Sequence, residues 1–359
     1  MAKKTTSSVP KKIGILRGME TTFPDALIPY INEHYGDRGV VAEFCSLDAF
    51  SQDEEPAYDL ILDRISHEVP FYRSYLKASA IKGTYVINNP FWWSADDKFI
   101  NNLVAQQVGV AIPRTVILPH NQHPPNTQTT SFRNLKYPLD WQQVFDYIGF
   151  PAFMKPHDGG GWRGVTKVNN PEEFFAAYNE SGTDCMMYQE GIEFTEYFRC
   201  YGVGRKKVHI MRYNPGAPHH LRYKDVPQAP IEPDLYARLE RDVLALCNAL
   251  GYDLNTVEFA VRDGIPYAID FMNPAPDGDY HSVGHENFEW IVTHMAEFMA
   301  EKVLSHKRKP IAFSPGKALD KKGFWLEGGF KPPLIFHPQK RPPVLCNNGY
   351  TKPSTTITG

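Results

Sequence analysis

The sequence predicts a mixed α/β and α+β protein, in which a small parallel unit precedes a larger unit of hairpins and helices. Apolar strands alternate with amphipathic helices over roughly the first 90 residues, which is typical of a parallel sheet. Further along the chain, paired strands joined by glycine-containing turns alternate with helices. The chain has 359 residues, 42% of them hydrophobic, which is enough for more than one core.

The first unit is expected to contain four strands. The apolar run at 12–16 predicts a buried strand, and the apolar spacing over 23–34 predicts the helix that follows it. Further strands are expected at 40–44, 58–64 and 85–88. Because helices separate these strands, we expect them to pair in parallel.

The second unit begins with a helix predicted over 95–108, where a capping-box variant at Ser94–Asp97 precedes apolar residues at helical spacing. Residues 119–137 are rich in Pro, Asn, Gln and Thr, which indicates a surface insertion. Strands are expected at 152–155 and 165–168, followed by a helix that begins after Asn170.

Two more amphipathic helices are expected, at 235–250 and 288–304, before a proline-rich end with no sustained periodicity. We therefore predict that the whole chain divides into four segments: a polar leader (1–11), an N-terminal domain (12–93), a larger domain of two subdomains (94–305) and a C-terminal tail (306–359).

Composition excludes several classes of protein. Lys and Arg total 38 against 41 Asp and Glu, so the net charge of -3 provides no field for attracting nucleic acid or anionic lipid. No run approaches the roughly 18 apolar residues of a membrane span, and no secretory signal precedes the first strand. The five cysteines are scattered and include no C-x-x-C pair, which favours a reducing, cytoplasmic location over a disulfide framework or zinc site.

A glycine-rich segment at 153–167 is the first candidate for chemistry. Lys155 lies on a predicted strand, and the turn that follows contains Gly159, Gly160 and Gly161. Such a turn lets backbone N–H groups approach phosphate oxygens, while the lysine supplies a positive charge. The segment matches neither a Walker A loop nor G-x-G-x-x-G, so a flexible hairpin loop remains the alternative.

Two carboxylates interrupt the apolar strands of a second hairpin, at Glu258 and Asp270. A buried carboxylate is costly unless it is paired or bound to a metal, so the two acids need a shared cation. A two-residue Asp-Gly turn would place them on opposite faces, whereas a three-residue loop with Gly264 in the left-handed conformation aligns them. We predict the longer loop and a Mg²⁺ site, with Asn273 nearby. An edge hairpin with its acids in solvent is the alternative.

A third segment runs from an apolar strand into a polar break at 186–193. A strand end of this kind exposes backbone N–H and C=O groups that could read an adenine edge, and a nearby acid could hold ribose hydroxyls.

Together these motifs resemble the ATP-grasp superfamily in order and approximate spacing. The branches that the chain resembles are the glutathione-synthetase-type and peptide-ligase-type enzymes, over about residues 12–304. The motifs that carry the resemblance are Asp97-Lys98, Lys155 with its glycine turn, Gln189-Glu190-Gly191-Ile192, and Glu258 followed by Asp270 and Asn273; in the preceding domain they are Leu60–Ser66 and Val86–Pro90.

The resemblance implies an ATP-grasp fold preceded by a small Rossmann-like domain, and it implies roles for individual residues. Its nucleotide set comprises Lys98 and Lys155 with Gly159, Gly160 and Gly161 at the phosphates, Gln189, Glu190 and Ile192 at adenine, and Glu196 at the ribose. Its metal set for Mg²⁺ comprises Glu258, Asp270 and Asn273. Its catalytic cations comprise Arg199 and Arg212, with Arg222 and Lys224 at similar positions.

One feature departs from the family pattern. The usual Glu-x-Asn is replaced by Asp270-Phe-Met-Asn273, and in a regular strand this spacing puts the two side chains on opposite faces. Either a bulge realigns them, or Asp277 and Asp279 complete the metal site instead.

By this resemblance the chain is expected to be an ATP-dependent ligase that joins a small carboxylate to an amine through an acyl phosphate. The expected substrates are small molecules, with amino acids or a peptide among the candidates, and the expected cofactors are ATP and Mg²⁺. Neither nucleic acid nor a membrane is expected as a partner, and a homo-oligomer remains open. The alternatives are a small-molecule kinase of the same superfamily, a non-catalytic nucleotide-binding module and a plain structural protein.

Overall fold

The computed structural model describes residues 9–91, 97–160, 163–224, 226–227, 229–271 and 273–311. Most of the predicted leader and nearly all of the predicted tail lie outside these ranges. So do Ser94 and Gly161.

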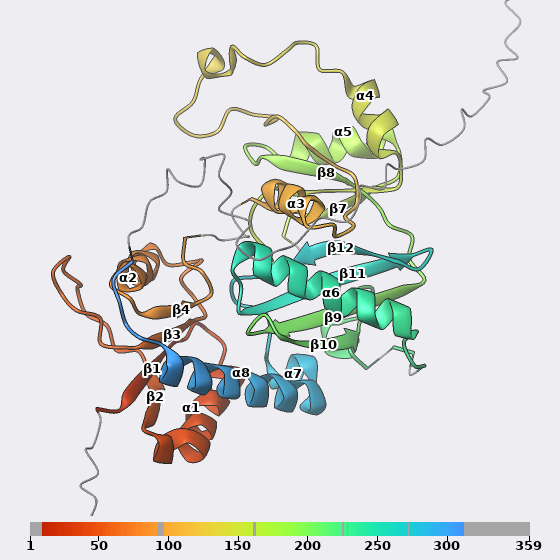
Figure 1. Cartoon of the computed structure of the whole chain (residues 1–359). Helices are drawn as coiled ribbons and strands as arrows, with labels where there is room; N and C mark the ends of the chain where they lie inside the picture. Colours follow the sequence, from red (N-terminus) through yellow and green to blue (C-terminus); the bar gives the residue numbers. More distant parts are fainter. Residues whose placement is uncertain are drawn as a thin grey trace, which may run out of the picture.

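The N-terminal domain is a four-stranded parallel sheet in the order β2-β1-β3-β4 (Figure 1). Its elements are β1 (Lys11–Leu16), α1 (Thr22–Tyr35), β2 (Val40–Phe44), β3 (Leu60–Asp63), α2 (Pro70–Ile81) and β4 (Tyr85–Ile87). All four strands lie within two residues of the predicted bounds, and their pairing is parallel as expected. The helix α2 has no counterpart among the predictions.

The remaining strands form two antiparallel sheets, in the orders β5-β8-β6-β7 and β10-β9-β11-β12. Elements of the first sheet and its helices are α3 (Lys98–Gln107), β5 (Thr115–Ile117), α4 (Trp141–Ile148), β6 (Ala152–Pro156), β7 (Thr166–Val168), α5 (Pro171–Glu180) and β8 (Met186–Glu190). Elements of the second are β9 (Glu196–Val203), β10 (Lys207–Arg212), α6 (Pro233–Leu250), β11 (Leu254–Arg262), β12 (Ile265–Phe271), α7 (Tyr280–Val283) and α8 (His285–Ser305). Short 3₁₀ turns occupy Gly36–Arg38, Thr129–Phe132 and His219–Leu221.

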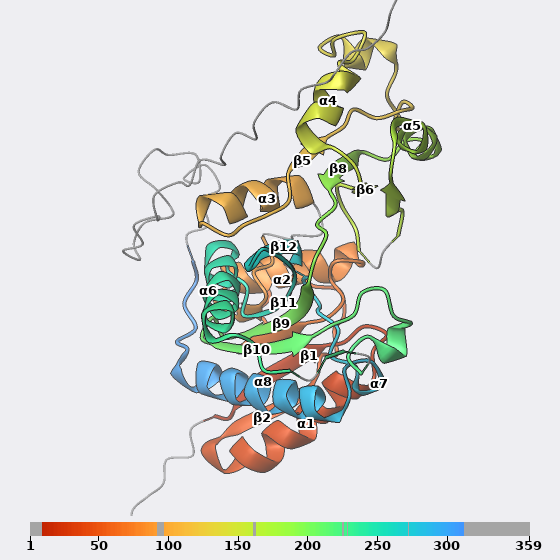
Figure 2. The same cartoon turned by 90° about the vertical axis from the view of Figure 1, so that its right-hand side faces the viewer.

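Helix α8 joins the N-terminal domain to the second antiparallel sheet. Its Met295 shares one buried cluster with Ile13 of β1, Leu27 of α1 and Tyr201 of β9. In Figure 1 the helix lies beside α1 and below β9 and β10, and Figure 2 shows the same arrangement from the side. A single hydrophobic core therefore fixes the two domains relative to each other.

The two antiparallel sheets have cores of their own. Helix α6 covers the second sheet on the face opposite α8, with Leu239 and Leu246 against Phe198 and Phe259. Helices α4 and α5 cover the first sheet, where Phe174 packs edge-on against the fully buried Tyr188. The faces that the helices leave uncovered are available to line a cavity.

Asn88 provides a polar link between the domains. Its side-chain oxygen accepts hydrogen bonds from the backbone N–H groups of Asp253 and Leu254 at 2.8 and 2.9 Å, and its amide donates to the Leu254 carbonyl at 2.7 Å. The buried amide thereby satisfies backbone groups at the start of β11.

Helix α3 begins later than predicted. Asp97 is its N-cap: the Asp97 carboxylate accepts a hydrogen bond from the Ile100 N–H at 2.9 Å. Asp97 therefore fixes where Lys98 begins the helix. Among the described helices, none is long and apolar enough to cross a bilayer.

Candidate active site

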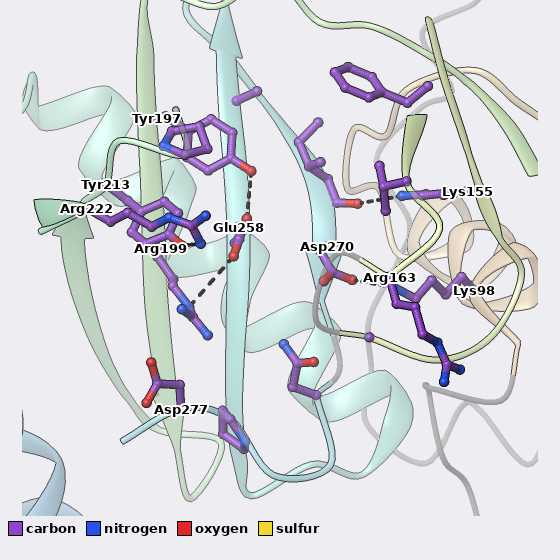
Figure 3. A pocket seen from close by; sticks show the side chains of 18 of the residues that line it. Lys98, Lys155, Arg163, Tyr197, Arg199, Tyr213, Arg222, Glu258, Asp270 and Asp277 are labelled. Carbon is purple, nitrogen blue, oxygen red and sulfur yellow. Dashed lines mark hydrogen bonds and ion pairs between the residues drawn. The ribbon is translucent and has the colours of Figure 1, made fainter. Parts of the chain in front are cut away.

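A cavity of about 940 Å³ opens between the two antiparallel sheets. Its lining comes from β6 and the following turn, from the end of β8, and from β9, β11 and β12. In Figure 3, Lys98, Lys155 and Arg163 lie on one side and Tyr197, Arg199, Tyr213 and Arg222 on the other. The carboxylates of Glu258 and Asp270 lie between these two groups.

Glu258 and Asp270 lie directly opposite each other on β11 and β12, although the predicted reason for their alignment is wrong. Arg262 pairs with Ile265, so the turn contains only two residues, Asp263 and Gly264, with positive φ values of 54° and 70°. This is the tight turn that Asp-Gly favours. A bulge restores the alignment: Phe259 pairs with Ala268 but Glu258 with Asp270, so Ile269 is an extra residue on β12.

Glu258 is held by two residues of β9. The Tyr197 hydroxyl donates to one carboxylate oxygen at 2.7 Å, and Arg199 Nε lies 3.8 Å from the other. Burial and the neighbouring Asp270 raise the pKa of Glu258, although Arg199 and Tyr197 favour its charged form. The carboxylate is thus poised to gain from a second cation in the cavity.

Asp270 lies close to Lys98 and Lys155. Lys98 Nζ lies 3.3 Å from its carboxylate, and the Asp270 side chain remains 37% exposed. Burial acts against its charge, but Lys98 and Lys155 outweigh this effect and lower the pKa of Asp270. Asp270 therefore presents an ionised carboxylate to the cavity at neutral pH.

Lys155 is only 8% exposed, and its ammonium contacts the carbonyl of Ile269 at 3.4 Å. Burial and the nearby positive charge of Lys98 lower its pKa to about 8. A lysine in this environment gains most from an added anion, because such a ligand restores the charge that burial disfavours.

The glycine-rich turn joins β6 to β7 along the edge of the cavity. Gly159 and Gly164 have φ values of 79° and 69°, which side chains rarely adopt. Gly159, Gly160 and Arg163 line the cavity, as does Asp158. The turn therefore follows a lysine-bearing strand and borders the cavity, as the sequence predicted.

At the end of β8, Gln189, Glu190 and Ile192 all line the cavity. The Glu190 carboxylate is held by Arg114 Nε and Arg262 Nη1, each at 3.0 Å. Burial opposes its charge, but these two arginines lower the pKa of Glu190. Its backbone N–H already donates to the Arg114 carbonyl at 2.9 Å, so this N–H is not available to a base. Within the described part of the chain, no hydrogen bond uses the Ile192 N–H.

Glu196 and Arg212 do not reach the cavity, contrary to what the resemblance implied. Arg212 Nη1 binds Glu196 at 2.6 Å, and the guanidinium lies over Phe198. Phe198 belongs to the core beneath α6, on the other face of the sheet. Because side chains alternate along a strand, Tyr197 and Arg199 point into the cavity while Glu196 and Phe198 point away. The expectation of a ribose acid at 196 and a catalytic arginine at 212 is therefore corrected.

The third predicted metal ligand is partly committed elsewhere. Asn273 lines the cavity, but its amide nitrogen donates to Thr256 at 3.1 Å. Asp277 accepts a hydrogen bond from Ser282, and Asp279 caps α7 through the His281 N–H at 2.9 Å. Both aspartates line the cavity, yet they also stabilise their own loop.

No cluster of three or more His, Cys, Asp or Glu side chains arranged to hold a metal occurs among the residues described here. Two opposed carboxylates nevertheless fit Mg²⁺, which takes one or two protein carboxylates and completes its shell with phosphate and water oxygens. Glu258 and Asp270 are the residues that would hold it.

Tyr197 and Tyr213 had no predicted role, and Arg222 was outside the predicted catalytic set, yet all three line the cavity. Arg222 Nη1 binds the Tyr213 hydroxyl at 3.0 Å, and Arg199 lies over the Tyr213 ring. The available signal was alternation along 196–203, which puts Tyr197 and Arg199 on one face. Choosing between the faces required knowing which one α6 covers.

Comparison with known proteins adds sequence similarity to this geometry, although no family model matches the chain. A D-alanine–D-alanine ligase from Ralstonia nicotianae is 28% identical over 207 residues, covering 51% of this chain and 62% of that protein. The human mitochondrial pyruvate carboxylase is 31% identical over 137 residues, covering 34% of this chain and 12% of that protein. The chain thus spans less than two thirds of the length of these relatives.

Solved structures share the fold over most of the chain. The D-alanine–D-alanine ligase from Bacillus anthracis complexed with ATP has a TM-score of 0.56 at 16% identity, covering 83% of this chain and 98% of that one. The VanG D-Ala:D-Ser ligase from Enterococcus faecalis gives 0.58 at 13% identity, covering 82% and 99%. A RimK domain ATP-grasp protein from Sphaerobacter thermophilus gives 0.56 at 15%, covering 82% and 100%. The expected fold is confirmed: the chain has the fold of these ligases and of this ATP-grasp protein, and it is similar in sequence to a D-alanine–D-alanine ligase.

Proposed function

We propose that this protein is an ATP-dependent carboxylate–amine ligase that works through an acyl phosphate. The observation that carries the proposal is the convergence of Lys98 and Lys155 on Asp270, opposite Glu258, in one cavity. Lysines beside a pair of carboxylates provide binding for phosphate oxygens and for the divalent cation that accompanies them.

In this proposal Lys98 and Lys155 bind phosphate oxygens of ATP. The glycine turn brings Gly159, Gly160 and the Arg163 side chain to the same end of the cavity. Glu258 and Asp270 would hold Mg²⁺, which supplies charge neutralisation at the phosphates. The lysines orient the transferred phosphoryl group and offset the negative charge that develops on it.

The reaction proceeds in two displacements. A carboxylate oxygen of the first substrate attacks the γ-phosphorus, the bond to the bridging oxygen of ADP breaks, and an acyl phosphate forms. The neutral amine of the second substrate then attacks the acyl carbon, inorganic phosphate leaves, and the nitrogen loses a proton as the amide forms. An acyl phosphate hydrolyses readily in water, so enclosure within the cavity favours the amine over water.

The far side of the cavity supports small, amino-acid-like substrates. Arg199 and Arg222 both lie near the Tyr213 ring, where their guanidinium groups can bind a carboxylate. Asp277 and Asp279 line the cavity beyond them and suit a positively charged amino group. Two of the solved structures named above are a D-alanine–D-alanine ligase and a D-Ala:D-Ser ligase, which agrees with this class of substrate.

The test is a panel of amino acids, dipeptides and small carboxylates, added singly and in pairs with Mg-ATP. Separate assays for ADP and inorganic phosphate distinguish the outcomes. A ligase releases both in equal amounts when the correct pair is present, whereas a kinase releases ADP without phosphate and a binding module releases neither. Asp270→Asn, which keeps the shape but removes the charge, should abolish turnover. Unchanged turnover in this variant would contradict the assigned site.

A further inference from the structure

Three polar side chains from different elements meet near the end of β8. Gln189 of β8 is 3% exposed and Asn102 of α3 is 5% exposed. Their amide nitrogens lie 2.9 and 3.2 Å from the Thr115 hydroxyl of β5. Thr115 is directly opposite Gln189 in the pairing of β5 with β8, which explains why these two side chains meet.

The single proton of the Thr115 hydroxyl determines the orientation of both amides. The hydroxyl donates to the Pro113 carbonyl at 3.0 Å, so toward its other two neighbours it acts only as an acceptor. Gln189 and Asn102 must therefore each present NH₂ to it. A reversed Gln189 amide would bring its oxygen against the Thr115 oxygen and leave a buried donor unpaired.

With its NH₂ group committed to Thr115, the Gln189 amide directs its oxygen the other way. Gln189 lines the cavity next to Glu190 and Ile192 at the end of β8. A fixed acceptor at this edge attracts an exocyclic amino group and repels an exocyclic oxygen.

We propose that Thr115 and Asn102 are positioning residues that lock the Gln189 amide, so that the site selects a 6-aminopurine nucleotide over a 6-oxopurine nucleotide. The inference rests on the nucleotide-binding part of the proposed function and is independent of the acceptor substrates. A 6-oxopurine can bind well only if the amide reverses, which breaks the hydrogen bond to Thr115. Sites built around a fixed polar partner discriminate strongly for this reason.

The experiment measures equilibrium binding of Mg-ATP and Mg-ITP to the full-length protein. The base of ITP carries an oxygen at position 6 where adenine has its amino group, and N1 is protonated. The wild-type protein should bind Mg-ATP at least about tenfold more tightly than Mg-ITP. In Thr115→Val, where the amide can reverse freely, this ratio should fall to below about threefold.

Two variants serve as controls. Thr115→Ser retains the hydroxyl and should keep the wild-type ratio. Thr127→Val removes a similar hydrogen bond, from a threonine hydroxyl to the Pro124 carbonyl, in the exposed insertion, and should also leave the ratio unchanged. Should Thr115→Val fail to fold, Gln189→Met provides the same reading, since it removes the amide itself and should lower the ratio equally.

Each result has one meaning. Equal binding of the two nucleotides by the wild-type protein overturns the inference, as does an unchanged ratio in Thr115→Val or, if that variant does not fold, in Gln189→Met. Binding of neither nucleotide rejects the nucleotide site and the inference with it. Discrimination that depends on Thr115, in a protein that shows no ligase turnover, supports the inference and rejects only the ligase reaction.

Discussion

Lys155 and Arg199 line the same cavity, yet their surroundings act on their charges in opposite directions. Lys155 is buried beside a second cation, Lys98, and its pKa is lowered to about 8. Burial also disfavours the charge of Arg199, but Tyr223 and Glu258 outweigh this effect and raise its pKa. One side of the cavity therefore has a buried cation that needs a further anion, whereas the other has a cation that is already neutralised.

This difference suggests separate tasks for the two sides. A buried lysine with a disfavoured charge gains from a polyanion such as a triphosphate. An arginine fixed by a carboxylate and a tyrosine hydroxyl is rigid, and rigidity suits the orientation of a substrate. The comparison predicts that substitutions on the two sides affect different measurable quantities.

The largest effect is expected for Lys155→Met, which keeps the length of the side chain but removes its charge. Because a charge-assisted contact with phosphate is lost from a water-poor site, the affinity for Mg-ATP should fall about 100-fold. Equilibrium titration measures the change. Lys136→Met, at an exposed position in the insertion, is the matched control and should bind like wild type. Similar affinities in both variants would remove the distinction between the two sides.

Arg199→Gln should leave Mg-ATP affinity within about threefold of wild type and lower acceptor-dependent turnover by about 100-fold. The reason is that Arg199 fixes Glu258 and faces the far side, without contacting the lysines. Steady-state kinetics with the substrate pair identified by the panel give kcat and KM separately. A loss of nucleotide affinity as large as that of Lys155→Met would contradict this division.

The pH dependence of binding provides a smaller effect. Above pH 8 the free protein loses the Lys155 proton, and bound phosphates should raise the lysine pKa again, so binding takes up a proton. We expect an uptake of about half a proton at pH 8 and almost none from Lys155 at pH 6. Above pH 8 the affinity should weaken with rising pH. Calorimetry in two buffers with different ionisation enthalpies measures the uptake, which should be absent at pH 8 in Lys155→Met.

The smallest effect on function is expected for Arg212→Gln. Arg212 pairs with Glu196 on the face beneath α6, so both nucleotide affinity and turnover should stay within about twofold of wild type. Thermal unfolding should show a loss of about 1 kcal/mol or less, since the ion pair is partly exposed. A large loss of activity with normal stability would restore the catalytic role that the family resemblance implied.

The nucleotide side could be predicted largely from the sequence because its signals are local. Lys155 and its glycines follow one another along the chain, and Gln189 to Ile192 form one short segment. The N-terminal sheet was predictable for the same reason, since each of its strands contains a short apolar run.

The far side could not be predicted in the same way, because it depends on long-range pairing. Tyr197 points into the cavity and Glu196 points away from it because α6 covers the other face of β9. The sequence alone does not show which face α6 covers. The bulge at Ile269 could not be predicted from the sequence either. The predicted three-residue loop aligned Glu258 with Asp270 correctly, but the structure achieves this alignment through the bulge. Helix α2 was missed although Pro70 begins it, and its buried residues are few.

The bulge in β12 has a consequence for how the hairpin tolerates change. The extra residue, Ile269, shifts the register between Phe259 and Glu258, and its carbonyl meets Lys155 at 3.4 Å. The extra residue therefore aligns Glu258 with Asp270 and also supplies the carbonyl group that contacts Lys155. If Ile269 took a place in the regular ladder, Glu258 would pair with Ile269, and Asp270 would lie on the opposite side of the ribbon. The turn at Asp263 and Gly264, several residues away, requires only residues that adopt positive φ values. A hairpin transplanted into another scaffold would carry its chemistry only if this single irregularity travelled with it.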